Sequence, residues 1–412
     1  MRWLIVEDAL RDRKGHWFEY LKGFAQELRA LGDQVTVLAD REAEPFLVEQ
    51  LQVQPVLAAS IWHRMGDGAG VLRRCLRVPV HAWRTYRSLS KYFQREKKYD
   101  VIFVPTVLVH HLLGWTSLIK RVFKRTQTRI ILFFPNTPIE LKPETNEPAW
   151  LPAPTAKLFC RLIRSLKKET EQGRVILGVE THPMRDALTR LTSLAFTYFP
   201  HPVQPYETEK PETLKTGTPR SKRAELNSMP LTFACYGPAR NEKGSDVLVA
   251  AIERYLRLFP DSQIKFVVQW VDDFRLPDGK IAALPLLLKQ HPQVEIVRSL
   301  FGDGEYVWRL KHASALLLPY RQSSYGLRVS RLAIEAMVNG IPAIVTRGTT
   351  LAEQGRQFGA MVLCEDGNVE NLAEAIRNMQ QNFWRLKEHA EQQKRLAREQ
   401  FSVEKFRHGL IG

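Results

Sequence analysis

One stretch, from Leu316 to Thr346, constrains the fold of this chain more than any other. Ala315 to Leu318 is a short apolar run, which is typical of a strand buried on both faces of a parallel sheet. A polar loop follows from Tyr320 to Gly326, and apolar residues then recur at helical spacing until Gly340 ends the helix. Ile341 to Thr346 is again apolar and β-branched. The stretch therefore predicts two parallel strands joined by a crossover helix, and ligands of such units bind at the carboxyl ends of the strands.

The same alternation of strands and helices continues along the whole chain of 412 residues, which is too long for one ordinary core. We predict an α/β protein with two Rossmann-like domains, residues 1–205 and 231–382. A segment rich in Pro, Thr, Lys and Glu, residues 206–230, is predicted to be a linker or an excursion. Residues 383–412 are predicted to be terminal helices.

The net charge of +16 is concentrated in one part of the chain. Residues 60–174 contain 22 Lys and Arg against 8 Asp and Glu, interleaved with tryptophans such as Trp83 and Trp115. Basic helices that carry bulky apolar residues suit the surface of an anionic membrane, where each basic residue contributes about 1 kcal/mol. A solvated basic face over ordinary core helices explains the pattern equally well. Nucleic acid is disfavoured as a partner, since no zinc-finger, RNP or basic-zipper pattern accompanies the charge.

Other features of the sequence favour a cytoplasmic protein. The sequence contains no run of about eighteen apolar residues, the length that spans a bilayer. The apolar run Trp3 to Val6 is too short for a secretory signal. The four cysteines are widely spaced, so we expect buried thiols and neither a metal site nor a disulfide framework. They are Cys75, Cys160, Cys235 and Cys364. The sequence leaves the oligomeric state open.

Two polar loops of the first domain are candidates for contact with a substrate. The opening strand is followed by a loop with Gly15 and His16, but this lone glycine does not make the GxGxxG fingerprint of dinucleotide-binding proteins. A Rossmann dehydrogenase is therefore disfavoured, and His16 is either a substrate-binding residue or an ordinary loop residue. His182, which precedes Pro183, is a candidate acid or base, although a histidine in this position is more often a helix cap.

A glycine-containing loop, GPARNEKGSD, follows the first strand of the second domain. Gly237 permits a tight exit from the strand, and Arg240 and Lys243 place two cations before a helix capped by Ser245 or Asp246. Cations oppose the helix dipole at an amino terminus unless an anion lies between them. A bound phosphate and a solvated charged turn both account for the loop.

The sequences GPARNEKG and YGLRVSRLAIEAMVNGIPAIVT resemble two motifs of the glycosyltransferase family 4 enzymes, which have the GT-B fold. In that family the motifs read GRxxxEKG and GFGLxxxEAMAxGxPV. The resemblance covers most of the chain and includes FSVEKF near its end. It implies two Rossmann-like domains facing across a cleft, with terminal helices in 383–412 that return to the first domain. It also implies a nucleoside-diphosphate sugar as co-substrate. We expect neither a metal nor another cofactor, because cationic side chains and helix dipoles take the role of a divalent ion and the sequence shows no acidic metal-binding pair.

The resemblance assigns roles to particular residues of the second domain. Lys243 matches the residue that holds the donor diphosphate. Pro238 stands where the family usually has an arginine, so Arg240 would reach the phosphate from a different position. Glu335 matches the glutamate that binds the nucleotide ribose, and a carboxylate that accepts two hydroxyl groups suits that task.

The chief departure from the family pattern is a missing carboxylate. The first acid of the family's Glu-x7-Glu pattern would fall at Leu327, or at Ser323 if residues 325–327 align with the family's Phe-Gly-Leu. The remaining pattern is similar to a Tyr-x-x-Arg-x-Ser variant of some bacterial relatives, here Tyr325, Arg328 and Ser330. Arg328 could supply the positive charge at the phosphate that the displaced arginine does not.

The resemblance and the loops together define an expected site. Lys243, Arg240, Arg328 and His16 are expected at the reacting groups, and the donor and acceptor are expected to contact Gly15, His182, Gly237, Ser323, Tyr325, Gly326, Leu327, Ser330 and Glu335. The expected activity is that of a retaining, metal-independent hexosyltransferase with a lipid-linked or membrane-proximal acceptor, in polysaccharide or glycolipid synthesis on the cytoplasmic face of a membrane. Two alternatives stay open: a GT-B epimerase or phosphorylase, and a non-catalytic sugar-nucleotide-binding protein, which the missing acid would favour.

Overall fold

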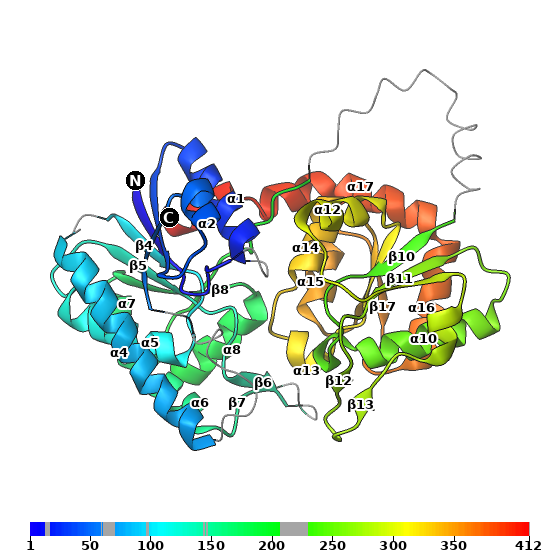
Figure 1. Cartoon of the computed structure of the whole chain (residues 1–412), viewed down its shortest axis with the longest axis horizontal. Coiled ribbons are helices and arrows are strands. Elements are labelled where there is room, and N and C mark those ends of the chain that lie inside the picture. The colour runs from blue at the N-terminus through cyan, green and yellow to red at the C-terminus, as the bar shows by residue number, and fades with distance from the viewer. Residues whose placement is uncertain are drawn as a thin grey trace. The chain divides into compact units, whose positions relative to one another are not determined.

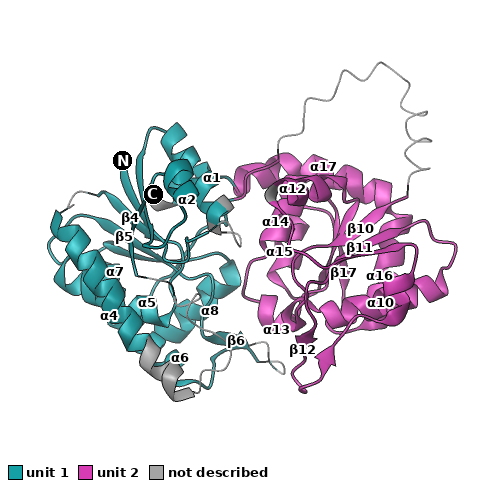
Figure 2. Ribbon diagram, viewed as in Figure 1, with its two compact units in different colours: residues 1–202, 402–412 teal, residues 203–401 magenta. Residues whose placement is uncertain are grey.

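The computed structural model describes residues 1–12, 17–58, 60, 71–95, 99–142, 145, 147–206 and 230–411. The chain divides into two compact units, shown in different colours in Figure 2. Unit 1 consists of residues 1–202 and 402–412, and unit 2 of residues 203–401. Figure 1 shows that each unit is a sheet with helices packed around it.

Unit 1 is built on a seven-stranded parallel sheet in the order β3-β2-β1-β4-β5-β8-β9. Its central strands are apolar runs buried along nearly their whole length, as expected for a sheet covered on both faces. The strands are β1 (Arg2–Val6), β2 (Gln34–Asp40), β3 (Val53–Leu57), β4 (Val101–Val104), β5 (Arg129–Phe133), β8 (Val175–Val179) and β9 (Thr197–Tyr198). The helices are α1 (Trp17–Ala30), α2 (Pro45–Leu51), α4 (Val71–Arg95), α5 (Val109–Arg121), α6 (Pro154–Arg164), α7 (Lys167–Glu171) and α8 (His182–Thr192), and β6 (Ile139–Leu141) and β7 (Pro148–Trp150) form a hairpin.

Helix α18 (Val403–Ile411) attaches the end of the chain to unit 1. Its Phe406 is fully buried and packs against Phe24 and Phe103, with ring centroids 5.1 and 5.4 Å apart. The guanidinium of Arg407 donates two hydrogen bonds, of 2.6 and 3.1 Å, to the buried carboxylate of Asp33. This pair and the aromatic contacts fix α18 in the core of unit 1.

Unit 2 is built on a six-stranded parallel sheet in the order β14-β11-β10-β15-β16-β17. The strands are β10 (Thr232–Cys235), β11 (Lys265–Gln269), β14 (Val294–Val297), β15 (Ala315–Leu318), β16 (Ala343–Thr346) and β17 (Met361–Cys364). The helices are α10 (Ser245–Leu258), α11 (Leu286–Gln290), α12 (Asp303–His312), α13 (Gln322–Tyr325), α14 (Arg331–Val338), α15 (Thr350–Phe358), α16 (Val369–Gln381) and α17 (Phe383–Gln400). A 3-10 turn covers Asn241–Lys243, and β12 (Phe274–Arg275) and β13 (Ile281–Ala282) form a hairpin.

The unit boundaries differ from the predicted ones. Helix α17 belongs to unit 2, because Ala397 and Phe401 share a buried cluster with Val203, Ile334 and Met337. The predicted return of residues 383–412 to the first domain is therefore limited to residues 402–412, and unit 1 ends at residue 202 instead of 205. The predicted linker, 206–230, lies almost entirely outside the described residues.

Two further predictions can be compared with the structure. No helix among the described residues is both long and apolar enough to cross a membrane. Cys235 and Cys364 are buried free thiols as predicted, and Cys160 is a half-buried free thiol. The side chain of Cys75 lies outside the described part of the chain.

Candidate functional site

The candidate residues of unit 2 follow two adjacent strands. The strand order reverses between β10 and β15, and open parallel sheets bind ligands outside the carboxyl ends of the strands at such a point. Residues 237–243 follow β10, and residues 320–330 follow β15. Two sequence motifs that are far apart in the chain therefore meet at the edge of the sheet where a ligand is expected.

The loop after β10 requires glycine at two positions. Gly237 has φ +87° and its amide donates a 2.5 Å hydrogen bond to Oε1 of Gln269. A Cβ atom at Gly237 would collide with Nζ of Lys243, so this glycine lets the ammonium lie directly against the backbone. Gly244 has φ +61°, and a Cβ atom there would collide with the carbonyl oxygen of Pro319, which precedes the second loop. Both glycines thus permit close contacts that position Lys243.

Lys243 is a partly buried cation without an ion-pair partner among the described residues. Its Nζ lies 5.9 Å from the centre of the Tyr320 ring. Burial lowers the pKa of Lys243, and the positive charge of Arg240 lowers it further against the opposing effects of Cys235 and Glu242. A partly desolvated ammonium gains most from a bound anion, so Lys243 is suited to contact one.

Arg240 and Arg328 converge on one carboxylate. Nη1 of Arg240 lies 3.5 Å from Oε1 of Glu242, and Nη1 of Arg328 lies 3.3 Å from Oε2 of the same residue. Both contacts are long, and the three side chains are exposed or half-buried, so each ion pair contributes at most about 1 kcal/mol. The two guanidinium groups can therefore turn to a more strongly charged ligand at small cost.

The helix after this loop begins slightly differently from the prediction. The 3-10 turn of residues 241–243 precedes α10, whose N-cap is Gly244. Ser245 is the first helical residue, and its Oγ accepts a 3.0 Å hydrogen bond from the amide of Arg240. The predicted capping role of Ser245 or Asp246 is thus wrong, although Ser245 still fixes the backbone of Arg240.

The candidate residues of the loop after β15 differ in how deeply they are buried. Ser323 is exposed on the short helix α13, whereas Gly326 and Leu327 are buried. The Tyr325 ring centroid lies 4.5 Å from that of Tyr320, and burial raises the pKa of Tyr325 to about 12, so its hydroxyl stays protonated and can donate a hydrogen bond. Ser330 is the N-cap of α14, where its Oγ accepts from the amide of Ala333 at 3.3 Å.

Glu335 is buried in a polar cluster that the sequence did not predict. Its side chain is only 1% exposed, and its Oε1 accepts hydrogen bonds from Tyr206 Oη at 2.9 Å and Arg331 Nε at 3.0 Å. The hydroxyl of Tyr306 donates to the other oxygen, Oε2. A carboxylate accepts about four hydrogen bonds, so capacity for one more donor remains. Arg331 and Glu335 are four residues apart on α14, which is the spacing at which side chains of one helix meet.

Of the three candidate residues of the first domain, His182 lies among the described residues. Gly15 and His16 lie outside the described residues. His182 is the exposed first residue of α8, and its ring centroid lies 3.9 Å from that of Tyr198. The N-cap of this helix is Thr181, whose side chain accepts from the amide of Met184, so His182 is not the cap.

The structure also reveals a buried polar cluster in unit 1 that was missed in the sequence. Glu7 and Asp8 follow β1, His110 and His111 lie in α5 after β4, and His81 comes from α4. Burial and the neighbouring Asp8 raise the pKa of Glu7 to about 7, and burial lowers the pKa of His110 to about 2. Burial alone would raise the pKa of Asp8, but His111 and His81 hold it below its ordinary value.

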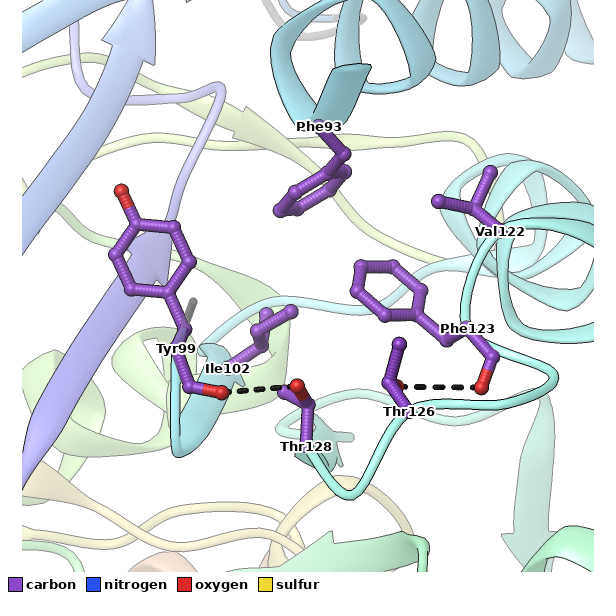
Figure 3. A pocket seen from close by; sticks show the side chains of 7 residues that line it. All are labelled: Phe93, Tyr99, Ile102, Val122, Phe123, Thr126 and Thr128. Atoms are coloured by element: carbon purple, nitrogen blue, oxygen red, sulfur yellow. Dashed lines mark hydrogen bonds between the residues drawn. The ribbon is translucent and has the colours of Figure 1, made fainter. Parts of the chain in front are cut away.

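A separate cavity of about 180 Å³ lies in unit 1 where β4 and β5 begin, away from their carboxyl ends (Figure 3). Phe93, Phe123 and Tyr99 contribute aromatic walls. The hydroxyls of Thr126 and Thr128 donate to the carbonyl oxygens of Phe123 and Tyr99, at 3.2 and 2.8 Å. Because these hydroxyls are bound to the backbone, the cavity has a largely apolar lining.

Comparisons with known proteins agree with this architecture. Residues 230–382 match the family model described as Glycosyl transferases group 1. No curated protein matches the chain in sequence.

Solved structures are similar over the full chain at low sequence identity. Sucrose-phosphate synthase from Thermosynechococcus elongatus is 15% identical with a TM-score of 0.63, covering 100% of this chain and 98% of that one. An alpha,alpha-trehalose-phosphate synthase from Burkholderia xenovorans is 13% identical with a TM-score of 0.63, and both chains are covered completely. HepE from Anabaena, solved with UDP and glucose, is 13% identical with a TM-score of 0.59, covering 100% of this chain and 98% of that one. The chain therefore has the GT-B fold, and its residues 230–382 form a domain of the glycosyl transferases group 1 family.

Proposed function

We propose that this protein transfers a sugar from a nucleoside-diphosphate sugar to an acceptor. The observation that carries the proposal is the convergence of Lys243, Arg240 and Arg328 after two adjacent strands of the group 1 domain. Breaking the glycosidic bond places negative charge on the diphosphate leaving group, and fixed cations stabilise that charge most where it develops. Three cations and the amino terminus of α10 supply this stabilisation at the diphosphate, so no metal ion is required there.

Different residues around the cations contact different parts of the donor. Lys243 contacts the diphosphate, with Arg240 and Arg328 turning from Glu242 to the phosphate oxygens. Tyr325 donates a hydrogen bond to the phosphate or the sugar. Glu335 accepts one ribose hydroxyl with its remaining capacity, and it accepts the second when Tyr206 or Tyr306 gives up its hydrogen bond. Ser330 supports this arrangement as the N-cap of α14.

UDP is the nucleotide that we propose to test first as the carrier of the donor sugar. HepE was solved with UDP and with UDP-glucose, and it shares the fold of this chain. We assign a retaining mechanism on the resemblance to family 4, and Gly15, His16 and His182 to the acceptor side.

The proposed acceptor is lipid-linked or close to a membrane on its cytoplasmic face. Between residues 109 and 129 the chain has five Lys or Arg and no Asp or Glu, and the cavity of Figure 3 opens beside them. Helix α4 also exposes Val80 and Trp83, a combination of charge and apolar surface that favours anionic lipids. Co-sedimentation with anionic vesicles tests this part, and binding that does not weaken with salt would contradict it.

Product analysis tests the reaction itself. The full chain is incubated with isotopically labelled UDP-sugars and a membrane-lipid extract, and the products are separated by mass spectrometry. We expect label in a lipid fraction together with stoichiometric UDP. Label recovered only as an epimer of the donor or as a sugar phosphate would contradict sugar transfer and favour the epimerase or phosphorylase alternative. Donor binding without any turnover would indicate the non-catalytic alternative.

A further inference from the structure

The buried cluster of unit 1 brings metal-binding groups from three segments to one point. Nε2 of His81 and Nε2 of His111 lie 3.0 and 2.9 Å from the same oxygen, Oδ2 of Asp8. Nε2 of His110 lies 3.1 Å from Nε2 of His111. One ring nitrogen from each histidine lies within 4.8 Å of those of the other two, and all three side chains are buried. The cluster lies where the strand order of unit 1 reverses, between β1 and β4.

Among the described residues, Oδ1 of Asp8 is a buried atom without a hydrogen-bond partner. The other oxygen of this carboxylate, Oδ2, is shared by Nε2 of His81 and Nε2 of His111. An unsatisfied buried polar group costs about 1–3 kcal/mol, so a cation bound by this carboxylate would remove that cost. A cavity of about 20 Å³ is lined by Asp8, Thr106 and His111, and this is room for a single ion or water.

The donor set identifies the class of ion. Imidazole nitrogens with one carboxylate oxygen suit zinc and other first-row transition metals, whereas calcium and magnesium prefer oxygen ligands alone. Zinc bonds to nitrogen of about 2.0–2.1 Å place tetrahedral ligand atoms about 3.3 Å apart. Three of the six separations among the four ligand atoms, 2.9 to 3.1 Å, are shorter than this by a few tenths of an ångström, and the ring nitrogens of the three histidines all lie within 4.8 Å of one another. We propose that His81, His110, His111 and Asp8 bind one divalent transition-metal ion of the zinc type.

The proton positions of two rings bear on this proposal. Nδ1 of His81 lies 3.4 Å from Oγ1 of Thr85, so the ring can keep its proton on Nδ1 and offer Nε2 to the metal. Nδ1 of His111 accepts a 3.2 Å hydrogen bond from the amide of Leu108, which places the proton of the neutral ring on Nε2. Metal binding moves that proton to Nδ1 and opens the contact with Leu108. His111 is therefore the ligand whose surroundings change most on binding.

The ion would link β1, α4 and α5 within unit 1, and it is not part of the donor site proposed for unit 2. The inference does not depend on the proposed function, because every ligand lies in the other unit. It departs from the expectation that the protein carries no metal.

The test uses the full chain without a polyhistidine tag, stripped with a chelator and titrated with zinc chloride in a calorimeter. We expect one ion per chain, and a loss of affinity of more than about 100-fold in His81→Ala and His110→Ala. His312→Ala, an exposed histidine in α12 of unit 2, is the matched control and should bind zinc like the wild type. Zinc binding that is absent, or equal in the cluster variants and the wild type, overturns the proposal.

A second measurement needs no substitution. Cobalt chloride added to the stripped wild-type chain should give the strong visible absorption of tetrahedral cobalt, and one equivalent of zinc should abolish it. Absence of that absorption, or failure of zinc to remove it, contradicts a tetrahedral site even if the variants fail to fold.

Discussion

Replacing Glu335 should destabilise unit 2 as well as weaken nucleotide binding. The carboxylate is buried and accepts hydrogen bonds from Tyr206, Tyr306 and Arg331. Glu335→Ala removes the acceptor of all three donors, and breaking such a buried charged cluster costs about 3–5 kcal/mol. Arg331 is 28% exposed and can be partly hydrated, so we expect the lower end, about 3 kcal/mol. In a unit of this size each kcal/mol lowers the melting temperature by about 2–4 °C, which predicts a decrease of about 6–12 °C.

Differential scanning calorimetry of the full chain measures this decrease, and hydrogen exchange at α14 shows whether it arises in unit 2. Glu388→Ala, an exposed glutamate in α17 of the same unit, is the control and should melt like the wild type. Tyr306→Phe, which removes only one donor, should cost about 1–2 kcal/mol. A Glu335→Ala chain that melts within experimental error of the wild type would refute the buried cluster. Any loss of nucleotide affinity in this variant must be read only after its folding has been checked.

Three other predictions follow from the charges and turns of the structure. Because Lys243 is a partly buried cation, Lys243→Met should stabilise ligand-free unit 2 by about 0.5–2 kcal/mol in thermal denaturation. This advantage should shrink as the pH rises toward 10, since the folded chain, with its lowered pKa, releases that proton before the unfolded chain does. Arg407 holds the pKa of the buried Asp33 below its ordinary value, so wild type should lose its advantage over Asp33→Asn as the pH falls below about 3.9. An equal acid midpoint for both chains would contradict this. Gly244→Ala should cost more than about 2 kcal/mol, from its positive φ and from collision with the carbonyl of Pro319, and a neutral result in urea unfolding would exclude that contact.

The strands of the sheets were largely predictable because a strand buried on both faces is a continuous apolar run. Ala315–Leu318 has the predicted bounds. The predicted strand from Ile341 begins at Ala343, since Pro342 has no amide to donate to the ladder. The helical turn α13 was predicted as loop, because four residues are too few to show a helical period.

The candidate site was predictable only where a local motif carries it. Arg240 and Lys243 occupy one short loop after β10, and Arg328 follows β15, which is adjacent to β10 in the sheet, so the sheet topology brings them together. The tyrosine partners of Glu335 could not be predicted, because Tyr206 and Tyr306 lie 129 and 29 residues away in the chain. The histidine cluster was missed for the same reason, since Asp8 and His111 are 103 residues apart and the histidines lack the spacing of a sequence motif.

The most direct test of the central claim is calorimetric titration of the full chain with UDP and with UMP. A diphosphate held by Lys243 should make UDP bind more tightly than UMP by about ten-fold or more, since a charge-assisted hydrogen bond contributes about 1.5–3 kcal/mol. Lys243→Met should remove most of that difference, while Lys289→Met, an exposed lysine of the same unit, should preserve it. Equal preference for UDP over UMP in the wild type and in Lys243→Met would contradict the assignment of the diphosphate to Lys243.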